Sequence, residues 1–286
     1  MAVQLQLEDD GAPSFAPTVI SILNSAFMQE IPPSEAATAL DSLFDQTYRE
    51  HGNAADFLWW FWDLVHDLAR QIPHDSLAQD RLTSIIRELQ ALPEKTVDLG
   101  KGWGEDSSVQ NWTNLPLFGP TFREKLDEAT GTVQRQKRMV NLQAYAARLG
   151  GYRLIPIEVY AIWAFVDALE GTMTPIRGRP DEVNSDPMAI EDVAYKVKCA
   201  AIWMIHAGHV LHGRDEEIQG ATAGPLWKLD KKEGIQLRRK TKGTDGLCDE
   251  RWKLWQERFD LIRGLNELET EARELAGEAW AVMNAV

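Results

Sequence analysis

Residues 53–73 read NAADFLWWFWDLVHDLARQIP, and the spacing of their apolar side chains predicts the fold class. The apolar positions recur at intervals of three and four, and they are Phe57, Trp60, Phe61, Leu64, Val65 and Leu68. That period is typical of an amphipathic α-helix, whereas a half-buried strand alternates at every second residue. Asn53 is a suitable N-cap and Pro73 cannot continue a helix, so we expect one helix between them.

The stretches on either side of this helix are organised in the same way. Residues 32–52 open with two prolines and close at Gly52, and residues 75–93 close at Pro93. Both stretches carry apolar residues at helical spacing. Three amphipathic helices joined by short links favour an antiparallel bundle, which would form an N-terminal helical layer over residues 14–93.

The C-terminal half predicts a second bundle over residues 121–284. Its segment 155–171 is apolar on nearly every side, which is typical of a buried helix. Its segment 189–213 is the longest, and we expect it to be the central helix. Only residues 3–8 alternate as a short strand would. We therefore predict an all-α protein, a single-domain helical bundle of residues 1–286 with long irregular connections at 94–121, 172–187 and 225–246.

The charge balance argues against several classes of function. The chain has 30 Lys and Arg and 44 Asp and Glu, which gives 286 residues a net charge of −14. We expect no nucleic-acid partner and no adhesion to an anionic membrane, because like charges repel. No apolar stretch is long enough for a membrane span. Cys199 and Cys248 are the only cysteines and the first residues do not resemble a secretory signal, so we expect a cytoplasmic protein.

Four stretches together resemble a fungal family of intracellular all-α proteins whose functions are largely unassigned. They are VNLQAYAARLGG (140–151), AIWAFVDALEG (161–171), AIWMIHAGHVLHG (201–213), and GPLWK (224–228) with ERWKLWQERF (250–259). Some members of that family lie in gene clusters for specialised metabolites. The resemblance covers roughly residues 55–284 and implies a fungal, cytosolic, all-α protein. The chain departs from the family at His209, where a lysine is expected.

A second resemblance concerns the stretch NELETEARE at residues 266–274. Asn266, Thr270 and Glu274 are spaced four apart, which would stack them on one helix face. This pattern resembles the Asn/Ser–Thr–Glu magnesium triad of class I terpene cyclases, whose oxygen ligands hold a hard cation that grips a diphosphate. The resemblance implies Mg²⁺ as the cofactor and a prenyl diphosphate as the substrate. The alternative interpretation is an acidic helix face in solvent.

A magnesium site of that kind needs a second group of carboxylate ligands opposite the triad. Asp167 and Glu170 lie three apart at the end of the apolar segment 155–171, so they are the best candidates for the opposing metal ligands. Asp127 with Glu128, or the run 215–217, could serve instead. The Asp-Asp-x-x-Asp motif of the cyclases is absent. A structural ion pair or a solvated helix end is the alternative for Asp167 and Glu170.

Aromatic and basic residues complete the predicted substrate site. A ring face stabilises a cation by about 0.5–2 kcal/mol, so aromatic residues of the most apolar helices would suit a cyclase cavity. The candidates are Trp60, Trp163, Trp203, Trp255 and Phe259. Arg177 or Arg214 would contact the diphosphate. Aromatic stripes at helical spacing also fill ordinary cores, and this alternative stays open.

Two histidines support a different chemistry. His206 and His209 interrupt the apolar segment 189–213, which makes them the best candidates for a catalytic general base. No His-Glu-x-x-His zinc motif is present. Histidines in such helices are also commonly hydrogen-bonded residues of the core or its boundary.

Three functions are therefore compatible with the sequence. The leading hypothesis is a Mg²⁺-dependent class I-type terpene cyclase acting on a prenyl diphosphate. The second is a non-catalytic helical interaction or ligand-binding protein that takes a small apolar molecule, and the third is a metal-free cyclase or isomerase with a histidine proton relay. The basic insert at residues 228–242 would cap an anionic substrate, dock a partner, act as a nuclear signal or form a mobile solvated loop. No sequence feature predicts the oligomeric state.

Overall fold

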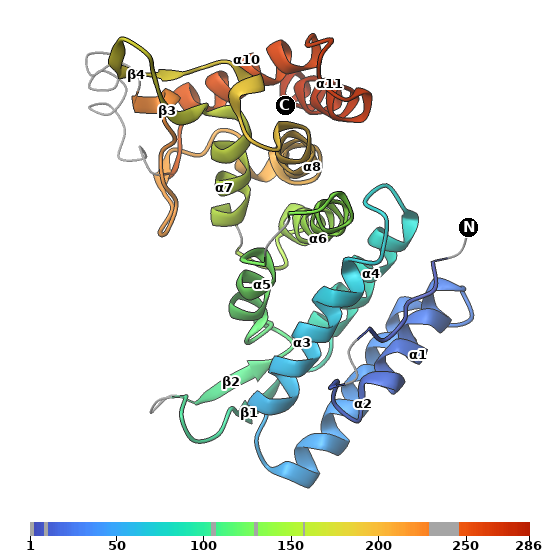
Figure 1. The fold of residues 1–286 in the computed structure, drawn as a ribbon. Coiled ribbons are helices and arrows are strands. Elements are labelled where there is room, and N and C mark those ends of the chain that lie inside the picture. Colours follow the sequence, from blue (N-terminus) through green and yellow to red (C-terminus); the bar gives the residue numbers. More distant parts are fainter. Residues whose placement is uncertain (1–2, 9–10, 104–106, 129–130, 157, 229–245) are drawn as a thin grey trace. The chain divides into compact units, whose positions relative to one another are not determined.

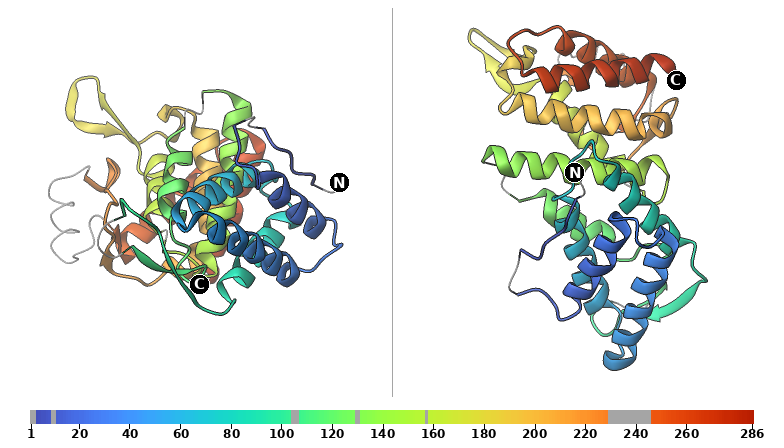
Figure 2. Two further views of the ribbon diagram at one scale, coloured as in Figure 1. Left: turned by 90° about the horizontal axis from the view of Figure 1, so that it is seen from below. Right: turned by 90° about the vertical axis from the view of Figure 1, so that its right-hand side faces the viewer.

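The computed structural model describes all residues except 1–2, 9–10, 104–106, 129–130, 157 and 229–245. The basic insert of the sequence therefore lies almost entirely outside the described residues. The chain folds into two compact units, Met1–Tyr145 and Ala146–Val286. Figure 1 labels their elements, and Figure 2 gives two further views. The division falls within a long helix, α6 (Val133–Gly151), rather than in the connection over 94–121.

The first unit is built mainly from helices. Besides the first part of α6, they are α1 (Ala16–Phe27), α2 (Pro33–His51), α3 (Ala55–Ala69), α4 (Leu77–Gln90) and α5 (Phe118–Leu126). Helix α4 packs along α2, and α5 packs along α3. The helices predicted between residues 32 and 93 are confirmed. Asn53 caps α3 as expected, because its side-chain oxygen accepts a hydrogen bond from the Asp56 amide.

Aromatic rings fill the centre of this unit. The ring of Trp112 lies 5.6, 5.3 and 6.1 Å from those of Phe44, Phe61 and Trp62, measured between centroids. All four side chains are fully buried or nearly so. Edge-to-face packing of this kind adds about 0.5–1.5 kcal/mol per pair to the burial of apolar area. The aromatic stretch of α3 therefore forms a core, with Trp60 on the outside at 46% exposure.

The second unit surrounds one central helix. Its helices are the end of α6, α7 (Glu158–Leu169), α8 (Val193–Leu211), α10 (Asp249–Arg263) and α11 (Thr270–Ala285), with short 3₁₀ turns η1 (Pro187–Ala189) and η2 (Leu226–Lys228). Helix α8 packs against both α7 and α11, and α10 packs against α11. The expectation that the segment 189–213 forms the central helix is confirmed.

Short pairs of strands lie in or next to the connections that the sequence predicts to be irregular. They pair β1 (Lys95–Asp98) with β2 (Ser108–Asn111), β3 (Thr172–Ile176) with β4 (Arg179–Asn184), and β5 (Glu216–Glu217) with β6 (Gly246–Leu247), all antiparallel. Residues 3–8 belong to no strand, and the backbone of Leu5 instead bonds to the side chain of Asn24. Since the described strands are this short, the all-α prediction is confirmed.

Two further properties bear on function. None of the described helices is both long enough and apolar enough to cross a membrane. Cys199 and Cys248 are buried free thiols, and burial raises the pKa of Cys199 to about 12. Cys199 lies on α8, one turn before Trp203.

A buried histidine makes the first unit sensitive to acid. His66 is fully buried on α3, with its Nε2 atom 3.1 Å from the Thr121 hydroxyl and its ring against Phe118 and Phe122. Burial lowers the pKa of His66 from 6.5 to about 3. The unfolded chain therefore binds this proton more readily than the folded one between these two values.

We expect the free energy of unfolding to fall as the pH drops below 6.5, by about 1.4 kcal/mol per pH unit from this group. Below about pH 5, protonation of carboxylates also changes the free energy of unfolding. The contribution of His66 is therefore measured between pH 5 and 6.5. His66→Gln keeps a donor for Thr121 but does not titrate, and its stability should be flatter across that region. Urea unfolding at a series of pH values measures the slopes. Equal slopes in the two proteins would contradict burial of a neutral ring.

Candidate functional site

The three residues of the predicted magnesium triad do not lie on one helix face. Helix α10 ends at Arg263 and α11 begins at Thr270, so Asn266 lies in the intervening turn rather than on a common helix face with Thr270 and Glu274. The prediction of one continuous face is wrong because the chain turns after Gly264, where Leu268 is buried and anchors the turn. Asn266, Thr270 and Glu274 are all exposed to solvent.

Glu170, predicted as an opposing metal ligand, is instead a buried structural residue. Its Oε1 atom accepts hydrogen bonds from Arg251 Nε at 2.7 Å and from the Trp255 indole N–H at 2.8 Å. Its Oε2 atom accepts one from the Gly224 amide at 2.7 Å. Because Glu170 and Arg251 are both 0% exposed, this carboxylate does not lie at a cavity rim as predicted.

Arg251 extends the same network. It donates to the backbone carbonyl oxygens of Gly246 and Thr222, at 2.8 and 2.9 Å. One buried ion pair therefore ties the end of α7 to α10, to β6 and to the segment before η2. Among the described residues, Asp167 is exposed and no group of three His, Cys, Asp or Glu stands together as metal ligands would.

The two predicted histidines lie where α8 passes the end of α6. His209 is exposed, and its Nε2 atom lies 3.1 Å from the carbonyl oxygen of Gly151, one of the last carbonyls of that helix. The backbone of His206 approaches Gly151 so closely that a Cβ atom there would overlap the His206 carbonyl. This region is a helix crossing, in which His209 satisfies a terminal carbonyl group.

The remaining predicted substrate residues are spread over the fold. Trp255 and Phe259 are buried in the core of the second unit, and Trp163 donates to the Gly220 carbonyl oxygen. Arg177 is exposed at the turn between β3 and β4, and Trp60 belongs to the first unit. Among the described residues, Trp203 and Arg214 line one common cavity.

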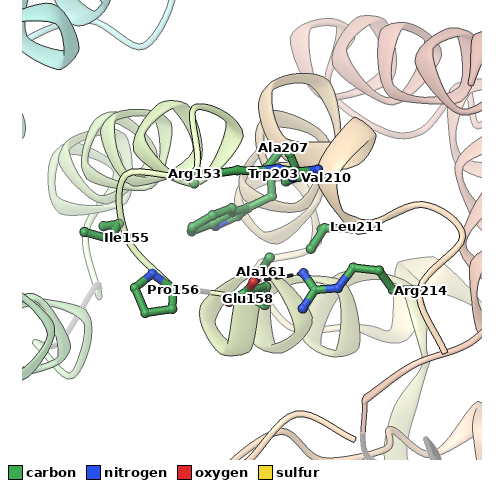
Figure 3. Close-up of a pocket in the computed structure, with 11 residues that line it drawn as sticks. Arg153, Ile155, Pro156, Glu158, Ala161, Trp203, Ala207, Val210, Leu211 and Arg214 are labelled. Carbon is green, nitrogen blue, oxygen red and sulfur yellow. Dashed lines mark hydrogen bonds and ion pairs between the residues drawn. The ribbon is translucent and has the colours of Figure 1, made fainter. Parts of the chain in front are cut away.

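That cavity is a pocket of about 400 Å³ within the second unit. It is lined by the end of α6 and the following turn, the start of α7 and one face of α8, with Gly150, Arg153, Ile155, Pro156, Glu158, Ala161, Trp203, Ala207, Val210, Leu211 and Arg214. Most of these residues are apolar, and Trp203 is only 1% exposed. Figure 3 shows its indole ring projecting from α8 toward Ile155 and Pro156. The size and lining fit a small-molecule site.

An ion-pair cluster forms one side of the pocket. The Arg214 guanidinium follows α8 and donates through Nη1 to Glu158 at the start of α7, at 2.8 Å. Through Nε it also bonds to Glu216. Burial lowers the pKa of Arg214, but hydrogen bonds to the two carboxylates more than offset this and raise it above its ordinary value. The cluster holds α7 and the end of α8 together at the pocket mouth (Figure 3).

A strained turn forms the opposite side. After α6, Arg153 adopts φ +57°, the left-handed conformation that favours glycine. Its amide donates to the Gly150 carbonyl and the Leu154 amide donates to that of Leu149, which is the Schellman pattern of helix ends. In Figure 3 the Arg153 side chain extends from this turn toward α8. The turn thus places a long cationic side chain at the pocket.

Residues 62–259 match the profile of a family described as a protein of unknown function, DUF3632. This is more than half of the chain. The chain belongs to the DUF3632 family. Neither a curated protein nor a solved structure matches it. The matched DUF3632 range contains every residue of the pocket, whereas Asn266, Thr270 and Glu274 follow it.

Sequence reasoning identified Trp203 and Arg214 but missed the other charged residues of this DUF3632 pocket, Arg153 and Glu158. A signal for Arg153 was present, because the Gly150–Gly151 pair marks a helix end and the next residues must turn. Glu158 gave no comparable signal. It resembles any acidic residue in the first turn of a helix, where its negative charge interacts favourably with the helix dipole.

Proposed function

We propose that this protein is a ligand-binding protein that holds a small amphipathic molecule in the pocket beside Trp203. The observation that carries the proposal is a cavity of about 400 Å³ whose lining is mostly apolar and includes the charged side chains of Arg153, Glu158 and Arg214. The apolar part of the ligand would lie against the apolar lining residues, and a polar group would stay near Arg153 and Arg214. This corresponds to the ligand-binding alternative of the sequence analysis.

The geometry gives less support to the two catalytic alternatives. A class I cyclase needs carboxylates that converge on magnesium beside its cavity, but Glu170 is sealed by Arg251 and Glu274 is exposed. The histidine relay needs a base facing the cavity, whereas His209 bonds to the end of α6. Cyclase activity, magnesium, a fungal origin and a cytoplasmic location stay predictions from the sequence alone.

The test uses the fluorescent probe 8-anilinonaphthalene-1-sulfonate, which combines an aromatic body with one negative charge. We expect saturable binding at one site and a concentration-dependent rise in the melting temperature, because a ligand that binds only the folded state stabilises it. Val210→Trp places an indole at the half-buried pocket wall and should weaken probe binding by about tenfold or more, equivalent to at least about 1.4 kcal/mol. Fluorescence titration measures both affinities.

Leu261→Trp is the matched control. It adds the same side chain at an exposed position of α10 outside the pocket lining, so probe affinity should not change. Near-ultraviolet circular dichroism establishes that both variants are folded. Equal probe affinity in wild type and Val210→Trp would contradict the assignment of the binding site.

A further inference from the structure

The charged side chains at the pocket differ in whether they form ion pairs. Arg214 is bonded to both Glu158 and Glu216, so the two carboxylates share one guanidinium. Arg153 is exposed, and within the described part of the chain its guanidinium makes no ion pair or side-chain hydrogen bond. The lining therefore offers one positively charged group with unused donors. A guanidinium presents five N–H donors in a fork that matches a carboxylate.

The backbone at Arg153 gives an independent indication. Its φ of +57° places a non-glycine residue where L-residues are strained. Glycine at this position would relieve the strain and retain the Schellman hydrogen bonds. Strained backbone conformations of this kind are concentrated at binding sites, where the role of the side chain in binding accounts for keeping a strained residue. The side chain that the turn carries is a cation directed along the pocket (Figure 3).

We infer that the ligand of this pocket is an organic monoanion, an apolar body with a single carboxylate that binds Arg153. This inference rests on the proposed function. A cationic ligand would have to compete with Arg214 for Glu158 and Glu216. Arg214 belongs to the same chain and already pairs with both carboxylates. A phosphate or diphosphate would bring further negative charge toward Glu158 and Glu216, with only one unpaired guanidinium to receive it.

The net charge of −14 does not oppose this assignment at short range. At physiological ionic strength, exposed charges are largely screened beyond about 8 Å, so the groups beside the ligand decide the sign. The apolar residues of the pocket then bind the body of the molecule. Affinity should therefore depend on the charge of the head group more strongly than a purely apolar pocket would allow.

The test compares four probes with one aromatic body: 1-naphthoate, 1-naphthalenemethanol, 1-naphthylmethylamine and 1-naphthylmethyl phosphate. Isothermal titration calorimetry should show naphthoate binding about tenfold or more tightly than the alcohol, the amine or the phosphate. Arg153→Gly should reduce naphthoate affinity by a similar factor, leave the alcohol unchanged and raise the melting temperature. A purely structural arginine would not combine higher stability with a loss confined to the anion. Arg153→Lys should restore part of the naphthoate affinity.

Arg177→Gln is the control, because it removes an exposed guanidinium from the β3–β4 turn outside the pocket lining, and naphthoate binding should persist. If the alcohol binds as tightly as naphthoate, or if the phosphate binds more tightly, the carboxylate assignment is wrong while the pocket stands. The same conclusion follows if Arg153→Gly binds naphthoate normally. If no probe binds and Val210→Trp changes nothing, the proposed function itself fails.

Discussion

Replacing Glu170 with alanine should destabilise the protein by about 3–5 kcal/mol, the cost of leaving one partner of a buried ion pair alone. The substitution strands the Arg251 guanidinium at a site without solvent access and removes acceptors from Trp255 and the Gly224 amide. Unpaired buried donors carry their full desolvation cost. Since typical domains are stable by only about 5–15 kcal/mol, we expect a large drop in the urea midpoint or loss of folded protein.

A second pair of variants keeps this prediction testable if Glu170→Ala does not fold. Glu170→Leu combined with Arg251→Met removes both charges, and apolar replacement of a buried ion pair is often close to neutral. The double variant should therefore be less destabilised than the sum of the two single variants. Asp167→Ala is the matched control, because Asp167 is an exposed carboxylate one turn away and should change stability by no more than about 0.5 kcal/mol. A fully stable Glu170→Ala protein would rule out the structural role.

Replacing Gly151 with alanine should cost at least about 2 kcal/mol and abolish pocket binding. The new methyl group would lie well inside van der Waals contact distance of the His206 carbonyl oxygen, and this backbone atom cannot rotate away. Helices α6 and α8 would have to separate at their crossing. Because Arg153 follows two residues later, its turn would move with α6. Chemical denaturation and naphthoate calorimetry measure the two effects.

Gly277→Ala is the control for Gly151→Ala. Gly277 lies within α11 of the same unit, and its added methyl group would meet nothing closer than 4.0 Å. Alanine stabilises a helix interior by up to about 1 kcal/mol relative to glycine, so this variant should be as stable as the wild type or more so. Equal stability of the two variants would show that the α6–α8 crossing tolerates a side chain.

The helices could be predicted from the sequence because their signals are local. In α3, the period of the apolar residues, the cap at Asn53 and the stop before Pro73 all lie within the segment itself. The hairpins lacked such signals. Strands β1 and β2 are four residues each, and they pair across a connection without alternating apolar residues. Their formation depends on contacts that periodicity does not report.

The site depends on long-range and backbone geometry, so less of it was predictable. Trp203 and Arg214 were identified from residue type, and both reach the pocket. Glu170 was assigned to a metal because nothing near it in sequence shows that Arg251, 81 residues later, neutralises it. Residue spacing suggested a common face for Thr270 and Asn266, but the break after Gly264 separates them. Arg153 acquires its position only through a left-handed turn.

The buried thiol of Cys199 can be used to measure transient opening of the structure around α8. A sulfhydryl held protonated and covered by its neighbours is attacked by alkylating reagents only while the surrounding structure is transiently open. The rate of its alkylation therefore measures how often α8 becomes accessible. A compound that occupies the neighbouring cavity should slow that rate, so occupancy can be followed by mass spectrometry on the unmodified polypeptide.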